Sequence, residues 1–165
     1  MRLLTLPLAV AVAFAAKPDD CWRMVKLGNK QEARTCFLGF ARSPDTFLRA
    51  EAQYGLRDYK AANDLFRLAV EQQPKNPDVR VRWGRMLAEP FNKNKADAVG
   101  LFQEALEIDK NHTGAMLGLA EVASDAFEAK AEEMARKVLE IDPKNVEAHE
   151  LIAILALEDS DPKKA

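Results

Sequence analysis

The chain contains two nearly identical stretches, ALEIDKN at residues 105–111 and VLEIDPKN at residues 138–145. Leu106 and Leu139 stand 33 positions apart, and Glu, Ile, Asp and Asn recur behind each of them. An enzyme active site has no reason to recur at a fixed period, whereas a stacked array of helices repeats its sequence every roughly 20–50 residues. The two stretches therefore predict a repeat architecture.

A marker alanine gives the period along most of the chain. Ala33, Ala62, Ala98, Ala131 and Ala165 are separated by 29, 36, 33 and 34 residues. Each of the first four begins a pattern with steps of four and three residues, which places its members on one face of a helix. In three units a proline follows, and proline ends a helix because its ring cannot continue the hydrogen-bond ladder. The patterns are Ala33–Phe37–Phe40–Pro44, Ala62–Phe66–Ala69–Pro74, Ala98–Phe102–Ala105 followed by Lys110, and Ala131–Ala135–Val138–Pro143.

A second apolar stretch precedes each of the later marker alanines and carries a small residue. Gly84, Gly118 and Ala153 stand 14, 13 and 12 residues before the next marker alanine. A small residue lets two helix backbones approach closely where they cross. We therefore interpret each unit as a helix hairpin, in which two antiparallel helices are joined by a turn.

These patterns resemble the tetratricopeptide repeat (TPR) family, whose unit has about 34 residues. The segments DYKAANDLFRLAVEQQPKNP (58–77) and KADAVGLFQEALEIDKN (95–111) match the second helix of that unit almost residue for residue. The resemblance implies an all-α fold, an α-solenoid of antiparallel helix hairpins wound into a right-handed superhelix. It covers residues 18–165 and predicts four to four-and-a-half repeats, with approximate units 18–44, 45–75, 76–110, 111–144 and an incomplete 145–165.

The sequence departs from the TPR pattern in each complete unit. The first hairpin is short, and the register of the first helix in the second unit is not fixed by the sequence. The third unit carries the insertion EPFNKNK, where Pro90 is expected to end the first helix. The fourth unit has Ala135 in place of the aromatic residue.

The N-terminal stretch MRLLTLPLAVAVAFAA predicts a secretory signal peptide. One arginine is followed by an uncharged run from Leu3 to Ala16, which is shorter than the about 20 apolar residues that span a bilayer. Ala13-Phe14-Ala15 matches the A-x-A cleavage pattern. We expect residues 1–15 to be removed and the chain to be exported, to the periplasm or the exterior. A buried N-terminal helix is the alternative.

The last unit is strongly apolar and incomplete. Leucine and isoleucine residues crowd the helix expected at 146–158, and the sequence stops at Ala165, where the partner helix should begin. An apolar helix without a partner exposes an adhesive surface. We expect this chain to be the N-terminal part of a longer protein. The alternative is self-association, in which a second copy covers helix 146–158.

Composition and motifs favour a protein without catalytic chemistry. The net charge of -2 argues against nucleic acid, because phosphates require clustered cationic charge. His149-Glu150 begins like the zinc-protease pattern H-E-x-x-H, but Ala153 occupies the second His position, and His112 lies far away in the sequence. The sequence contains no G-x-x-x-x-G-K-[ST] loop. We predict no catalytic residue, metal, cofactor or small-molecule substrate.

Cys21 and Cys36 are the two cysteines of the chain, and Gly28-Asn29-Lys30 forms the expected turn between them. Antiparallel helices folded about that turn bring both side chains to a similar height, and export places them in an oxidising compartment. We predict a disulfide that staples the first hairpin. Two buried free thiols are the alternative. Asn111-His112-Thr113 is formally a glycosylation sequon, although a turn explains an asparagine there better.

Stacked hairpins curve, and their first helices line a concave face. Arg80, Arg82 and Arg85 make a small cationic patch beside Trp83. We interpret it as a solvated helix face, and a site for an acidic peptide is the alternative. The Lys and Asn residues with which some TPR proteins hold a C-terminal carboxylate are absent from matching positions. The candidates to line the groove are polar or exposed residues of the first helices: Asp78, Arg82, Arg85, Glu89, Leu119, Val122, Glu147 and Glu150.

Three functional hypotheses follow. The first is a non-catalytic scaffold that binds a protein or peptide partner in an envelope or secreted assembly. The second is the helical arm of a larger secreted enzyme, such as a peptidase, whose catalytic domain lies beyond residue 165. The third is an enzyme in its own right. The reading frame after Ala165 distinguishes the first two.

Overall fold

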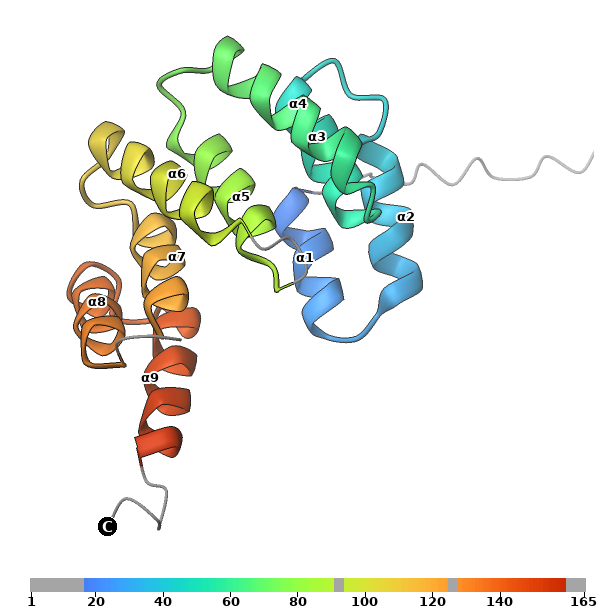
Figure 1. The fold of residues 1–165 in the computed structure, drawn as a ribbon. Coiled ribbons are helices and arrows are strands. Elements are labelled where there is room, and N and C mark those ends of the chain that lie inside the picture. Colours follow the sequence, from blue (N-terminus) through green and yellow to red (C-terminus); the bar gives the residue numbers. More distant parts are fainter. Residues whose placement is uncertain (1–16, 91–93, 125–127, 160–165) are drawn as a thin grey trace, which may run out of the picture.

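The computed structural model describes residues 17–90, 94–124 and 128–159. Within these ranges the chain is helical and contains no strand (Figure 1). The predicted signal peptide, residues 1–15, lies outside the described residues. The helices are α1 (Pro18–Lys26), α2 (Lys30–Phe40), α3 (Thr46–Gly55), α4 (Tyr59–Gln72), α5 (Pro77–Ala88), α6 (Lys95–Ile108), α7 (Thr113–Ser124), α8 (Glu128–Ile141) and α9 (Val146–Asp159).

Consecutive helices form hairpins that stack side by side along the molecule (Figure 1). Each helix packs against its hairpin partner, and the first helix of each hairpin also packs against both helices of the preceding one. The pairs α1–α2, α3–α4, α5–α6 and α7–α8 are followed by α9, which stacks on α7 and α8. The predicted all-α solenoid of helix hairpins is therefore confirmed.

The marker residues of the second helices form the seam of each hairpin. In α4, Ala62, Phe66 and Ala69 are all fully buried, and the same holds for the corresponding residues of α6 and α8. Burying a phenylalanine side chain is worth roughly 1.5–3 kcal/mol. The small alanines on the same face allow the neighbouring helices to approach the aromatic ring closely. The register deduced from the sequence is thus the register of the core.

Phe102 shows how two hairpins share this core. Its ring lies between Gly84 of α5 and Gly118 of α7, so close that a Cβ atom at these glycines would stand 2.7 Å and 2.4 Å from ring carbons. Gly55 approaches the ring of Phe37 in the same way, at 2.4 Å. Only glycine lets the backbones approach the rings this closely.

Local signals place the helix boundaries. The Asp45 side chain accepts hydrogen bonds from the backbone N–H groups of the first turn of α3, at 2.7 Å and 3.3 Å, and so sets the register that the sequence left open. Pro77 occupies the first turn of α5, where a proline has no hydrogen bond to lose. The helix ends at Ala88, two residues before Pro90, as predicted. Gly28 adopts φ +80° between α1 and α2, a left-handed conformation that glycine tolerates.

The short first hairpin is held by a covalent bond and by aromatic packing. Cys21 and Cys36 form a disulfide between α1 and α2, with their Cα atoms 5.5 Å apart. Closing a loop of this size is worth roughly 3 kcal/mol in the chain-entropy model. The ring of Trp22 lies edge-on to Phe37 at 4.9 Å and tilted on Tyr54 of α3 at 4.5 Å. Trp22 therefore couples α1 to the rest of the solenoid.

Candidate partner-binding groove

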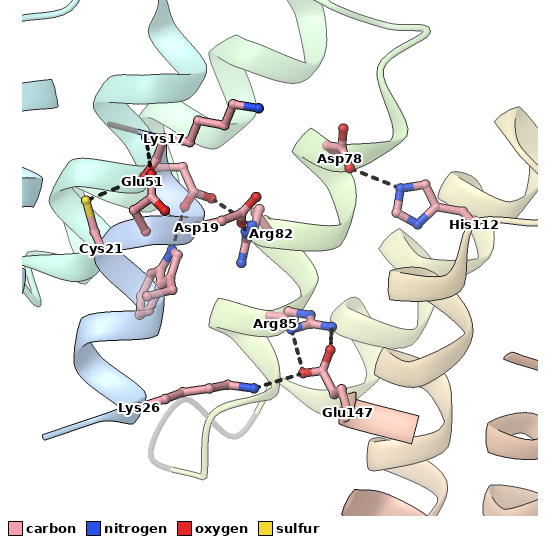
Figure 2. Close-up of polar contacts among 12 residues, drawn as sticks. Lys17, Asp19, Cys21, Lys26, Glu51, Asp78, Arg82, Arg85, His112 and Glu147 are labelled. Atoms are coloured by element: carbon pink, nitrogen blue, oxygen red, sulfur yellow. Dashed lines mark hydrogen bonds and ion pairs between the residues drawn. The ribbon is translucent and has the colours of Figure 1, made fainter. Parts of the chain in front are cut away.

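A cavity of about 480 Å³ opens between α1, α5, the start of α7 and α9. These are first helices of their hairpins, so the cavity lies on the face that the sequence predicts to be concave. Figure 2 shows charged side chains from these helices directed toward one another around this space. We refer to this cavity and its lining as the groove.

Arg82 of α5 links the first three units. Its guanidinium forms an ion pair with Asp19 of α1, and its Nε atom lies 3.4 Å from Oε1 of Glu51 on α3. The other carboxylate oxygen of Glu51 accepts a hydrogen bond from Nε1 of Trp22 at 2.6 Å. One buried carboxylate thus joins side chains from three successive hairpins.

Glu51 is fully buried, which is unusual for a glutamate. Burial raises the pKa of this carboxyl group, while Arg82 and the hydrogen bond from Trp22 act in the opposite direction without cancelling the rise. Its Oε1 atom has no hydrogen-bond partner among the described residues. Burying a carboxylate with an unsatisfied oxygen disfavours the charged form.

Arg85 and Glu147 form the central ion pair of the groove. Nη1 and Nη2 of Arg85 donate to the two carboxylate oxygens of Glu147 at 2.9 Å and 2.8 Å, a bidentate arrangement. Nζ of Lys26 lies 3.9 Å from the same carboxylate. Helices α1, α5 and α9, from the first, third and fifth units, therefore meet at one carboxylate (Figure 2).

The electrostatics of this pair reflect partial burial. Burial pushes the pKa of Glu147 upward, but the hydrogen bond and charge of Arg85 outweigh it, and the pKa is lowered. Desolvation raises the pKa of Glu121 on the neighbouring α7 against the attraction of Arg85, although the side chain as a whole is exposed. The Nε atom of Arg85 is buried and makes no hydrogen bond within the described part of the chain. The Nε donor of this guanidinium is therefore unused.

His112 and Asp78 form the wall of the groove at the start of α7. Nδ1 of His112 accepts a hydrogen bond from the backbone N–H of Ala115 at 3.2 Å, so Nε2 carries the proton and donates to Asp78 at 3.1 Å. This hydrogen bond lowers the pKa of Asp78. His112 thus caps α7 and ties it to α5, whereas its neighbour Asn111, the sequon residue, is exposed.

A second cavity of about 260 Å³ lies at the other end of α5, between Glu89 and Val122. The hydroxyl group of Tyr54 donates to Oε1 of Glu89 at 2.7 Å. Burial, together with this hydrogen bond, raises the pKa of Tyr54. Arg85 lines both cavities and separates them.

The structure distributes the predicted groove residues among three environments. Asp78, Arg82, Arg85 and Glu147 line the groove, and Glu89 and Val122 line the second cavity. Leu119 is partly buried against the core, and Glu150 is exposed on α9. Whether these eight residues contact a partner remains a prediction.

The predicted cationic patch is not a single surface. Arg80 does not join Arg82 and Arg85 but pairs with Glu104 of α6 at 2.9 Å. Trp83 donates from Nε1 to Asn63 of α4, on the side of α5 that faces the second helices. The reason is geometric, because residues two positions apart on a helix point in nearly opposite directions.

Sequence reasoning missed the contributions of α1 and α3 to the groove. Asp19, Trp22 and Lys26 all line it, and Glu51 lies behind it. Glu51 could have been recognised, because it stands four residues after Phe47 and three before Tyr54, on the apolar face of α3. A carboxylate on such a face requires a partner.

Two further properties apply to the described residues alone. In residues 17–90, 94–124 and 128–159, no cluster of three or more His, Cys, Asp or Glu residues is placed to hold a metal ion. Within the same ranges, no helix is both long and apolar enough to cross a membrane.

Comparison with known proteins supports the fold. No protein-family model matches the chain, and no curated protein matches it. Several solved structures, in contrast, resemble the fold of this chain. TTC0263, a thermophilic TPR protein of Thermus thermophilus, superimposes with a TM-score of 0.64 at 19% identity, covering 86% of this chain and 82% of its own. MamA from Desulfovibrio magneticus RS-1, from residue 41 to its end, gives a TM-score of 0.58 at 19% identity, covering 88% and 85%.

The first TPR domain of Spaghetti (RPAP3), solved bound to an HSP90 peptide of sequence SRMEEVD, gives a TM-score of 0.61 at 18% identity. It covers 70% of this chain and 91% of its own. The chain therefore has the fold of the tetratricopeptide repeat proteins, as its repeats predicted.

Proposed function

We propose that this chain is a non-catalytic scaffold that binds a protein or peptide segment in its groove. The observation that carries the proposal is the groove itself, a cavity of about 480 Å³ lined by the first helices of several hairpins. Its size falls in the range of roughly 300–1,000 Å³ typical of ligand pockets. The peptide bound to the Spaghetti domain supports the same class of ligand for this fold.

The chemistry of the groove favours a polar, extended segment. Arg82, Arg85 and Glu147 offer charge-assisted hydrogen bonds, and Trp22 and Val81 add a small apolar area. These side chains stand on helices that are packed into the solenoid, so their backbone positions are fixed before a partner binds. Preorganisation raises affinity because less conformational entropy is lost on binding.

Site-specific photo-crosslinking tests this function. A photoreactive amino acid in place of Arg23, which lines the groove, is expected to give a discrete adduct with the partner in the native compartment. The matched control replaces Lys137 of α8, which is exposed and pairs within its own helix with Glu133. Adducts of equal yield from both positions, or none from the groove, would contradict the proposal.

We further propose that the chain acts outside the cytoplasm. The predicted signal peptide at residues 1–15 and the disulfide between Cys21 and Cys36 support export, because disulfides persist in oxidising compartments. Mass spectrometry of the protein from fractionated cells should find the mature N-terminus at residue 16 or close to it. An intact N-terminus in the cytoplasmic fraction would contradict export.

The exposed apolar face of α9 offers a second surface for contact with another protein chain. Val146, Ile154 and Leu157 are 67%, 52% and 74% exposed, although they lie on the last described helix of an otherwise well-packed array. We propose that a second copy covers this face, and a following helix of a larger enzyme is the alternative. Sedimentation velocity of the purified chain should show a dimer that Val146→Ser and Ile154→Ser together dissociate. A monomer at high concentration would contradict self-association.

A further inference from the structure

Glu147 holds the position in the groove that a ligand carboxylate would occupy. Its two oxygens accept both terminal nitrogens of Arg85, and Lys26 approaches from the opposite wall. The carboxylate comes from α9, whereas the cations come from α5 and α1. The anion site is therefore built by one part of the chain and filled by another.

The solenoid does not need the ion pair between Arg85 and Glu147 to hold α9 in place. Within the described residues, α9 packs through its apolar residues on α7 and α8, and its backbone does not approach α5. The contact between α5 and α9 is made by side chains. If the Glu147 side chain rotates away, α9 keeps its core contacts and the guanidinium of Arg85 is released.

The charges around the groove show what would replace Glu147. Without this carboxylate, the lining keeps four cationic side chains, Arg23, Lys26, Arg82 and Arg85. Arg23 stays paired with Asp20, and Arg82 with Asp19 and Glu51, so Lys26 and Arg85 are the two cations that lose their carboxylate. The start of α7 adds the partial positive charge of a helix N-terminus. In addition, the buried Nε atom of Arg85 is a donor that Glu147 leaves unused. The vacated groove therefore attracts an anion.

We propose that Glu147 is an internal competitor for the anion site of the groove, an inference that rests on the proposed function. The partner segment then carries glutamate or aspartate side chains that displace Glu147 from Arg85. The groove is then partly closed by the side chain of Glu147 from the chain's own helix α9. Binding of the partner exchanges one carboxylate for another, and the apparent affinity is lower than the intrinsic affinity by the fraction of molecules with the groove open.

Fluorescence anisotropy with a defined peptide tests this competition. The probe is a fluorescein-labelled, C-terminally amidated peptide of sequence SAEEAEES, and its neutral counterpart is SAQQAQQS. Glu147→Gln is expected to bind the acidic peptide about tenfold more tightly than the wild-type chain. Glu140→Gln removes the same charge from an exposed position of the neighbouring helix α8, away from the groove, and should leave the affinity unchanged. Arg85→Gln should weaken binding at least tenfold, with or without Glu147→Gln.

Several results would overturn the inference. These are equal affinity of Glu147→Gln and wild type, an equal gain for the neutral peptide, retained binding by Arg85→Gln, or no binding of the acidic peptide at all. Each of them leaves the proposed function standing if the groove position still crosslinks to the partner. A groove that fails to crosslink contradicts the scaffold function separately.

Hydrogen exchange on the wild-type chain provides a test without substitution, in case Arg85→Gln disturbs the fold. The acidic peptide should slow exchange in α5 around Arg85 and accelerate it in the first turn of α9, where Glu147 is released. Slower exchange in both helices would mean that the peptide binds beside Glu147 rather than in its place, which contradicts competition.

Discussion

Replacing Gly118 by alanine tests whether the Phe102 ring sets the spacing between hairpins. The new Cβ atom would stand 2.4 Å, 2.5 Å and 2.8 Å from three ring carbons, against an ordinary contact distance of about 3.5–4.0 Å. The ring cannot withdraw, because Gly84 lies against it from α5, where a Cβ atom would stand at 2.7 Å. The α6 and α7 backbones must therefore move apart.

The expected magnitude combines two opposing terms. Overpacking of this kind costs typically about 1–3 kcal/mol. Replacing a glycine in a helix interior by alanine returns up to about 1 kcal/mol. We expect Gly118→Ala to lower the free energy of unfolding by roughly 1–2 kcal/mol, measured by urea denaturation followed by circular dichroism.

Gly100 provides a matched control on the same helix as Phe102. A Cβ atom at Gly100 meets nothing within 4 Å, so Gly100→Ala should raise the free energy of unfolding by roughly 0.5–1 kcal/mol. In a Phe102→Leu background, Gly118→Ala should cost clearly less, because the ring that it opposes is gone. Equal or greater stability of Gly118→Ala in the wild-type background would refute the reasoning.

Three further substitutions or conditions have defined outcomes. Reducing the Cys21–Cys36 disulfide should increase the mass by two hydrogens and accelerate hydrogen exchange in α1 and α2, with a loss of roughly 3 kcal/mol there; unchanged exchange would show that packing alone holds the hairpin. Since the folded state raises the pKa of Glu51, its contribution to stability is greatest below the ordinary glutamate pKa and declines as the pH rises through the raised value. Glu51→Gln should remove this decline in pH-dependent unfolding, and an unaltered profile would contradict the assignment. Asp45→Ala should destabilise α3 by about 1 kcal/mol in thermal unfolding while Asn in its place retains most of the stability; equal effects of the two would argue against the cap.

The sequence alone determined the repeat and its core. Helix geometry brings residues at steps of three and four to one face, so the pattern of Ala98, Phe102 and Ala105 specified a buried stripe without any knowledge of the neighbours. The same logic predicted the small residues at the crossings, where Gly84 and Gly118 lie against one ring. The buried stripe lies within one helix, and the small residues lie where neighbouring units cross. Both recur with the repeat, so the sequence pattern alone predicts them.

The groove was decided by the tertiary structure. Arg85 and Glu147 are separated by 62 residues, and Arg82 and Asp19 by 63, so no local pattern links them. Their meeting depends on the curvature of the whole stack, which accumulates from the small rotation between successive hairpins. The separation of Arg80 from Arg82 on α5 is different, because helix geometry alone places residues two positions apart on nearly opposite sides. A short periodicity in the sequence determines which residues are buried. The pairing of charges across the superhelix depends on the rotations between all the hairpins that lie between the two residues.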